Sequence, residues 1–245
     1  MSSPGLLFVL FETGDQVSEE EFHEWYGKEH IPLRTENFSA FRTGARYKAI
    51  DASKPKFAGV YTVSDSSVFT DPAYIALRAS RSPREVDLIK RLAVMDRRIY
   101  SLISDTTPMP NALDPTSISA SIIVCNSFTP VQSNEQAFHN WYENEYIPTL
   151  KQVPGWHRTR RFKLSDVQVV GLEAQVRKPF DPPTFLEVSE FDALSSLHNP
   201  KFPSDTAGSE VIGSATLSER RVFKLIKSYE PIAALRSMKT PDVIA

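Results

Sequence analysis

Two histidines, three glutamates, a tryptophan and a tyrosine lie within the segment EFHEWYGKEHIP, residues 21–32. Histidine has an ordinary pKa of about 6.5, which suits it to proton transfer near neutral pH. A carboxylate beside a histidine can orient it or shift its pKa, and a tyrosine hydroxyl can donate a hydrogen bond to a developing oxyanion. The residue types of this segment are therefore typical of general acid–base chemistry.

The segment recurs in the second half of the chain. FHEWYGKEHIP at 22–32 matches FHNWYENEYIP at 138–148, an offset of 116 residues, and we interpret the match as an internal duplication. His23 has a counterpart in His139, which favours a structural role such as a hydrogen bond between helix and strand. His30 has none, because Tyr146 occupies the matching position. His30 is thus the stronger candidate for chemistry.

An amphipathic helix is expected to carry these residues. Ser18 and Glu21 have the spacing of a capping box, which predicts a helix start at Glu19. Pro32 lacks the backbone N–H that a helix interior needs. We therefore predict a helix over 19–31 that ends at this proline.

Glu29 is the least expected residue on this helix. Projection at 100° per residue places Glu29 in the middle of the apolar stripe and His30 at its edge. Burial of an unpaired carboxylate costs several kcal/mol, so the group must be paired, be protonated or face a cavity. One interpretation is an ion pair with an arginine of the sheet, Arg46 or Arg42. The other is an acid or base beside a pocket.

The elements around the helix have the same order in both copies. In the first copy we predict strands at 5–12, 41–50, 56–63 and 96–104, and helices at 19–31 and 72–92. In the second copy we predict a strand at 118–128, which includes the apolar run SIIVCNSF. Ser133 and Gln136 have the spacing of another capping box, which predicts a helix that runs to about residue 147. Strands at 156–164, 184–191 and 220–228 follow, with a helix from 195. About thirteen extra residues around 167–183 predict a long hairpin or loop.

This order, β-α-β-β-α-β, is the ferredoxin-like unit with both helices on one face of an antiparallel sheet. We therefore predict an α+β fold with two ferredoxin-like units in one chain, whose sheets pack as a pseudo-dimeric α/β barrel. The first repeat would cover 1–105 and the second 118–228. A proline-rich linker at 106–117 would join them, and 229–245 would form a C-terminal tail.

Composition excludes several classes of function. The formal net charge of −2 gives no reason to expect nucleic acid or an anionic membrane as a partner. The single Cys125 excludes an internal disulfide, and its apolar neighbours predict a buried, inert thiol. No apolar run approaches the ~20 residues of a membrane span, and the N-terminus lacks the features of a signal peptide. We therefore expect a cytoplasmic protein.

Cofactor and metal motifs are missing from the sequence. The glycines do not have the spacing of a phosphate-binding loop, and there is neither a G-x-S-x-G nor an H-E-x-x-H pattern. His23 and His30 would lie about 10 Å apart on a helix, too far to share a metal ion easily. We expect no cofactor and no metal. The expected partner is a small-molecule substrate or ligand, and further self-association stays open.

The pattern of Trp25, Glu29, His30 and Pro32, on a helix after the first strand of a ferredoxin-like unit, resembles the EthD-like branch of the dimeric α/β-barrel superfamily. The second copy carries Trp141, Glu145 and Pro148, with Tyr146 departing from the histidine. The resemblance implies a barrel of two antiparallel sheets, a pocket between each sheet and its helices, and cofactor-free proton chemistry. Relatives include polyketide cyclases, decarboxylases of aromatic polyketide acids and cofactor-free monooxygenases.

The first hypothesis is a cofactor-independent lyase or cyclase acting on an aromatic or polyketide-like small molecule by decarboxylation, dehydration or cyclisation. His30 would be the general base or acid, Tyr26 the donor to an oxyanion and Glu29 the residue that tunes His30, with His23 as a further catalytic candidate. The pocket would be walled by four aromatic residues: Phe22, Trp25, Tyr47 and Tyr61. The alternatives are a non-catalytic small-molecule-binding or stress-response protein of the same fold, and a duplication with a purely structural helix.

Overall fold

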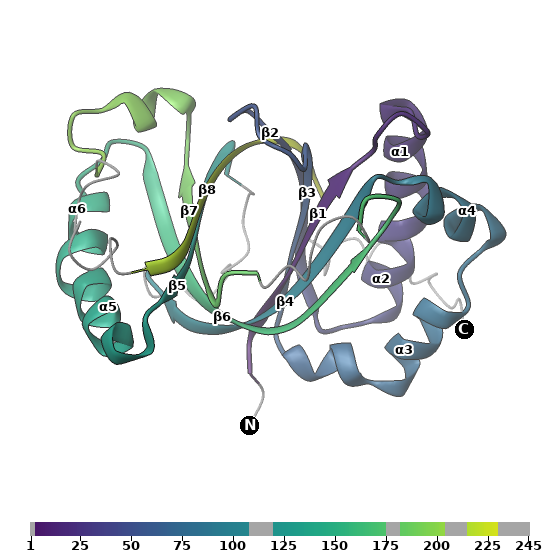
Figure 1. The fold of residues 1–245 in the computed structure, drawn as a ribbon, viewed down its shortest axis with the longest axis horizontal. Coiled ribbons are helices and arrows are strands. Elements are labelled where there is room, and N and C mark those ends of the chain that lie inside the picture. The colour runs from purple at the N-terminus through teal and green to yellow at the C-terminus, as the bar shows by residue number, and fades with distance from the viewer. Residues whose placement is uncertain (1–2, 108–119, 175–181, 204–214, 230–245) are drawn as a thin grey trace, which may run out of the picture.

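Eight antiparallel strands form one closed barrel, with helices packed against its outside (Figure 1). The structure is a computed structural model and describes residues 3–107, 120–174, 182–203 and 215–229. The strand order around the barrel is β1-β3-β2-β8-β5-β7-β6-β4. The strands are β1 (Gly5–Glu12), β2 (Phe41–Ala49), β3 (Phe57–Val63), β4 (Val94–Asp105), β5 (Ile122–Pro130), β6 (Trp156–Val170), β7 (Phe185–Phe191) and β8 (Ala215–Ser228).

The helices form two groups on opposite sides of the barrel (Figure 1). The first group belongs to the half that contains β1–β4, and its members are α1 (Glu19–Trp25), α2 (Ile31–Asn37), α3 (Pro72–Ala79) and α4 (Pro83–Arg91). The second group consists of α5 (Glu135–Trp141) and α6 (Ile147–Leu150). Short 3₁₀ helices lie at Ser66–Thr70, Gln132–Asn134 and Leu194–His198. No helix among the described residues is long and apolar enough to cross a membrane.

Each half has the strand order of a ferredoxin-like unit, β4-β1-β3-β2 in the first and β6-β7-β5-β8 in the second. The halves join at two seams, where β2 pairs with β8 and β4 pairs with β6. The predicted fold, two ferredoxin-like units packed as an α/β barrel, is confirmed. Joining the sheets at both edges leaves no open strand between them.

Strand β1 reads as an apolar run because both of its faces are buried. Leu7, Val9 and Phe11 face the helices of the first half and belong to the core there. Leu6, Phe8 and Leu10 point into the barrel, where apolar side chains from both halves fill the interior. The alternation of a strand thus separates a helix-side core from a barrel core.

The helix that carries the repeated segment does not end at Pro32, so that prediction is wrong. Five residues, Tyr26–His30, form a π-helical turn in which Ile31 N–H donates to the carbonyl of Tyr26, and α2 then continues to Asn37. A π turn holds one more residue than an α turn, so a proline can follow without facing the carbonyl four residues before it. The second half has the same π-helical turn at Tyr142–Tyr146.

The extra residue also overturns the helical projection. Beyond the π turn the phase of the helix shifts, so Glu29 is only half-buried and Glu145 is exposed. His30, expected at the edge of the apolar stripe, is buried instead. The prediction of a carboxylate at the centre of the apolar face is therefore wrong, because it assumed a uniform 100° per residue.

Three other predictions need correction. The second capping box is absent: α5 begins after Asn134, and Ser133 lies in a 3₁₀ turn. Only a 3₁₀ turn, Leu194–His198, forms where a helix from 195 was expected. The expected long hairpin or loop at 167–183 begins as strand, because β6 continues to Val170, which pairs with Met95 of β4, and residues 175–181 lie outside the described part of the chain. The linker residues from 108 and the tail from 230 lie outside the described residues.

Candidate functional site

His30 lies between the first-half helices and is held by a carboxylate from a distant helix. Its Nδ1 is 3.0 Å from Oε1 of Glu85 in α4, and the two residues are only 7% and 1% exposed. The imidazole stacks on the ring of Tyr26, with centroids 5.0 Å apart, and packs against Trp25 at 4.6 Å. These contacts fix the ring in position and direction.

Burial and the nearby guanidinium of Arg34 lower the pKa of His30 to about 3, despite the opposing influence of Glu85. Burial alone would favour the neutral acid of Glu85. The hydrogen bond with His30 and the charges of Arg34 and Arg81 outweigh it, so the pKa of Glu85 lies below its ordinary value. The pair therefore consists of a carboxylate and a neutral imidazole whose Nδ1–H donates to Glu85.

The tautomer decides which nitrogen of His30 can react. With the proton on Nδ1, the lone pair is on Nε2. Among the described residues, no hydrogen bond engages Nε2. This arrangement resembles the way in which a carboxylate orients a catalytic histidine in hydrolytic triads.

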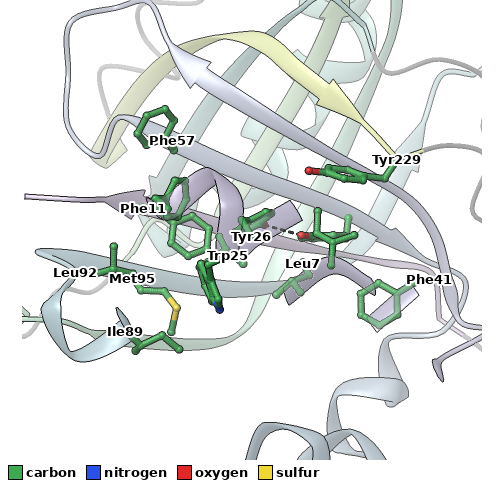
Figure 2. Close-up of a cluster of buried hydrophobic side chains, with 14 of the residues drawn as sticks. Leu7, Phe11, Trp25, Tyr26, Phe41, Phe57, Ile89, Leu92, Met95 and Tyr229 are labelled. Carbon is green, nitrogen blue, oxygen red and sulfur yellow. Dashed lines mark hydrogen bonds between the residues drawn. The ribbon is translucent and has the colours of Figure 1, made fainter. Parts of the chain in front are cut away.

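Tyr26, which stacks on the imidazole, lies in the apolar core of the first half (Figure 2) and is bonded to a second buried tyrosine. Tyr61 of β3 donates a hydrogen bond of 2.6 Å to the hydroxyl of Tyr26. Burial raises the pKa of both phenols well above their ordinary value, so both stay neutral donors. Gly59 makes this possible, because a Cβ at that position would lie 2.0 Å from the Tyr26 hydroxyl oxygen.

The structure brings most of the predicted site residues together. Phe22, Trp25, Tyr26 and Tyr61 all belong to the core between the first sheet and its helices. Tyr47 does not, because its side chain points into the barrel.

Glu29, expected to tune His30 by its field more than by direct contact, is bonded to another helix. Its carboxylate accepts a hydrogen bond from the Ser82 hydroxyl, and Ser82 is also the N-cap of α4, where it accepts from the backbone N–H of Glu85. Glu29 thus acts on the helix that supplies Glu85. It forms no ion pair with an arginine among the described residues, so the alternative of an ion pair with Arg46 or Arg42 also fails.

His23 and its counterpart His139 both contact the equivalent arginines of the sheet. Arg46 donates to the backbone carbonyl of His23 at 3.2 Å. Arg161 approaches Nδ1 of His139 at 2.6 Å, and it also forms a 2.8 Å ion pair with Glu143. The expected helix–strand hydrogen bond therefore exists in both halves, through the backbone in one and the imidazole in the other.

The matching region of the second half has different polar groups. Tyr142 donates to the buried carboxyl of Glu187 at 2.7 Å, and Asn126 donates to both Glu187 and Tyr146. Burial raises the pKa of Glu187. Glu187 occupies the position that Gly59 has in the first half, two residues after the phenylalanine that begins the strand. The two halves share a scaffold but differ at this site.

Sequence reasoning missed Glu85, Arg34 and Arg81. The Ser82-x-x-Glu85 spacing predicts a capping box, but the glutamate turns inward to His30 instead of back to the Ser82 N–H. Arg34 lies four residues after His30 and donates to its carbonyl at 2.6 Å. The contact of Glu85 with His30 has no signal in local spacing, because it spans 55 residues.

Two hollows lie near these residues. The one beside Tyr26, lined by His23, Arg46 and Gly59, is too narrow to hold a water molecule. The other is a cavity of about 470 Å³ between α4, β4 and β6. His30 does not line that cavity, but Arg81 does, and Arg81 Nε lies 3.6 Å from Glu85 Oε1. No cluster of three or more metal-ligating side chains occurs among the described residues.

No protein-family model matches the sequence. No curated protein sequence matches it either. Among solved structures, an anthrone oxidase-like protein has 10% sequence identity and a TM-score of 0.59, with 93% of each chain covered. A protein of Fusobacterium nucleatum assigned as a monooxygenase has 10% identity and a TM-score of 0.58, covering 93% of this chain and 94% of that one.

A protein assigned as a chlorite dismutase has 10% identity and a TM-score of 0.54, covering 98% of this chain and all of the other. At such low identity the likeness shows the fold alone. The chain has the fold of the dimeric α/β barrels, here with both ferredoxin-like halves in one polypeptide. Its neighbours in that fold are named as monooxygenase-like, anthrone oxidase-like and chlorite dismutase-like proteins.

Proposed function

We propose that the protein is an enzyme of the EthD-like branch of the dimeric α/β barrels, a cofactor-independent lyase or cyclase for an aromatic or polyketide-like small molecule. The observation that carries the proposal is the buried 3.0 Å contact between His30 and Glu85. This buried carboxylate fixes the tautomer of His30, as the carboxylate of a hydrolytic triad does for its histidine. An ion pair that only joined two helices at the surface would not require a fixed tautomer. The reaction is the removal of a proton that starts a decarboxylation, dehydration or cyclisation.

His30 serves as a base in this scheme and not as an acid. Its lowered pKa keeps the imidazole neutral over the physiological range, so Nε2 can accept a proton but has none to donate. A base of low basicity needs an acidic substrate proton, such as that of a phenol or of a carbon between two carbonyl groups. Aromatic and polyketide-like molecules carry both, which supports this class of substrate.

The other residues stabilise the negative charge that proton removal leaves behind. Tyr26 and Tyr61 are neutral phenol donors, and the buried guanidinium of Arg34 contributes a positive charge close to both. Donors placed in a buried site are worth more to a developing oxyanion than the same donors in water. Tyr26 keeps its predicted role, and Glu85 replaces Glu29 as the residue that orients His30.

A second candidate is a non-catalytic protein that binds a small molecule in the cavity beside Arg81 and leaves His30 covered. The narrow hollow beside Tyr26 and the small exposure of His30 favour it, because a substrate would have to displace side chains to reach the imidazole. The two candidates differ in turnover and not in binding.

The test is turnover of a panel of hydroxylated aromatic polyketide acids, followed by chromatography of substrate and product. We expect His30→Gln and Glu85→Gln each to lower kcat by about 10²–10⁴-fold, the usual contribution of an oriented base. Tyr146→Phe is the control, since it changes the matching position of the second half. Equal rates for the wild type and His30→Gln would remove His30 from the reaction, and binding without turnover would favour the second candidate.

A further inference from the structure

The cavity of about 470 Å³ lies where the two halves of the chain meet. One wall is α4 of the first half, and the floor is the seam between β4 and β6. Within that seam Met95 pairs with Val170, and Arg97 pairs with Gln168. Its volume falls within the ~300–1,000 Å³ of small-molecule sites.

The lining combines positive charge with apolar surface. Arg81 and Lys90 contribute the charges, and Gln168 contributes an amide whose oxygen already accepts from Arg78. The apolar part of the lining comprises Ile89, Met95, Val170 and Leu172. None of the described lining residues carries a carboxylate.

Two guanidinium nitrogens, one of Arg81 at the cavity and one of Arg97 in the strand β4 that forms part of its floor, are buried without a hydrogen-bond acceptor. Arg81 Nε lies 3.6 Å from Glu85, beyond hydrogen-bond reach, and is otherwise unpaired. Arg97 Nη2 has no hydrogen bond either, and that residue is only 5% exposed. A buried donor without an acceptor is costly, so its presence beside a cavity points to a ligand that accepts.

The charged groups around the cavity add to the positive charge of its lining. Burial and the charges of Arg97, Arg81 and Arg34 lower the pKa of Arg78, so four guanidinium groups influence one another in this region. Two carboxylates are paired with them: Glu85 beside Arg81, and Asp166 at 3.4 Å from Arg97. The field at the cavity therefore favours an anion.

We propose that this cavity is a binding site for an aromatic carboxylate, whose carboxylate is held by Arg81 and the neighbouring donors and whose ring lies on the apolar floor. Guanidinium groups bind planar carboxylates through two parallel hydrogen bonds. The side of the cavity that carries Met95 and Ile89 adjoins Trp25 in the core of Figure 2, whose indole Nε1 is also buried without an acceptor. The site thus lies next to the residues around His30.

The site deepens the proposed function and rests on it in one respect: the ligand would be the substrate of the reaction at His30. Arg81 connects the two places, since it lines the cavity and adjoins the carboxylate that orients the imidazole. A carboxylate bound at Arg81 would anchor the substrate while another part of it reaches the base. Arg81 is accordingly a binding residue and Glu85 a positioning residue.

The test is calorimetric titration of the full-length protein with benzoate, 2-naphthoate and anthracene-2-carboxylate, and with the uncharged amide of each acid. We expect at least one acid to bind ten or more times tighter than its amide, because a charge-assisted pair is lost with the amide. Arg81→Gln should weaken binding of that acid about tenfold or more and leave the amide unaffected. Lys90→Gln, at an exposed position, should weaken it by a smaller factor.

Arg84→Gln is the matched control. It removes a charge only three residues after Arg81, but Arg84 faces Glu24 at the surface and should leave binding unchanged. Thermal melting of each variant confirms that it is folded. Equal affinity for acid and amide, unchanged acid affinity in Arg81→Gln, or no binding of any acid at millimolar concentration would each overturn the proposal.

Turnover separates this site from the proposed function. Binding that depends on Arg81, in a protein that turns over none of the panel, keeps the site and removes the reaction. Turnover that depends on His30 but has the same KM in Arg81→Gln keeps the reaction and removes the site.

Discussion

At the scale of single residues, His30 differs from its counterpart Tyr146 in the partner that it finds. His30 reaches Glu85, a carboxylate on another helix, whereas Tyr146 accepts a neutral hydrogen bond from Asn126. The negative charge of a carboxylate favours the tautomer of histidine that donates to it. The amide of Asn126 is neutral and supplies no such charge. The asymmetry between the halves thus concerns charge as well as residue type.

The buried imidazole predicts a loss of stability on acidification. The unfolded chain protonates His30 near its ordinary pKa of about 6.5, whereas burial and Arg34 lower the folded value to about 3. The contribution of His30 to stability is therefore complete above pH about 6.5 and is lost as the pH falls toward 3, by at most about 1.4 kcal/mol per pH unit.

Urea unfolding of wild type and His30→Gln between pH 7 and pH 4 measures this effect. As the pH is lowered, the free energy of unfolding should fall more steeply for the wild type than for the variant, since the variant has no titratable group at this position. The charged groups that face His30 are Glu85, Arg34 and Arg81. In the variant, Glu85 loses its hydrogen bond with His30, which would further flatten the variant's plot of unfolding free energy against pH. Parallel curves would show that His30 titrates normally.

At the scale of elements, the π turn decides which side chains of the repeated helix are buried. It inserts one residue into Tyr26–His30 and Tyr142–Tyr146 alike. As a result His30 and Ile31 face the core, and Glu29 lies at the edge beside Ser82. π turns of this kind are frequent at functional sites.

Deletion of Lys28 tests the π turn. The remaining residues would form an ordinary α turn, and α2 would keep its phase because the π turn holds just the one extra residue. Pro32 would then face the carbonyl four residues before it, that of Gly27, so we expect the free energy of unfolding to fall by about 3 kcal/mol.

Lys28→Ala is the control for the deletion. The Lys28 side chain is exposed and pairs only with Glu24, so the change should stay within about 0.5 kcal/mol. Denaturant unfolding measures both variants. If the deletion is as stable as Lys28→Ala, the π turn is not needed to accommodate Pro32.

At the scale of the whole molecule, the barrel interior makes the two halves one cooperative unit. Phe223 of β8 is fully buried, and its ring meets that of Phe8 of β1 edge to face, with centroids 6.3 Å apart. This contact joins strands of different halves across the barrel. Neither sheet could bury its inner face without the other.

Phe223→Ala should destabilise both halves together. Truncation of a buried phenylalanine costs about 3–5 kcal/mol, and because the residue lies in the shared interior, one unfolding transition should move to lower denaturant. Hydrogen exchange of β1 and β7 amides would report the two halves separately. Ile226→Ala, at an exposed position of the same strand, is the control, and unfolding of only the second half would contradict a shared core.

The sequence by itself determined the strands, their order and the class of fold. An apolar run such as β1 follows from local burial, and the repeated order of elements left few topologies. It also proposed His30 and Tyr26 as candidates, because residue type alone limits proton chemistry. The direct partner of His30 had no local signal, since Glu85 lies 55 residues away.

Only the tertiary structure decided which groups surround the imidazole. The packing of α4 on α1 and α2 brings Glu85 to His30, and the π turn sets the phase that turns Glu29 away. The seam of β4 and β6 places Gln168 in the same cavity as Arg81, which precedes α4. The physical reason is that spacing along a chain fixes periodicity, whereas charge pairs and cavities arise between elements that only the folded packing brings together.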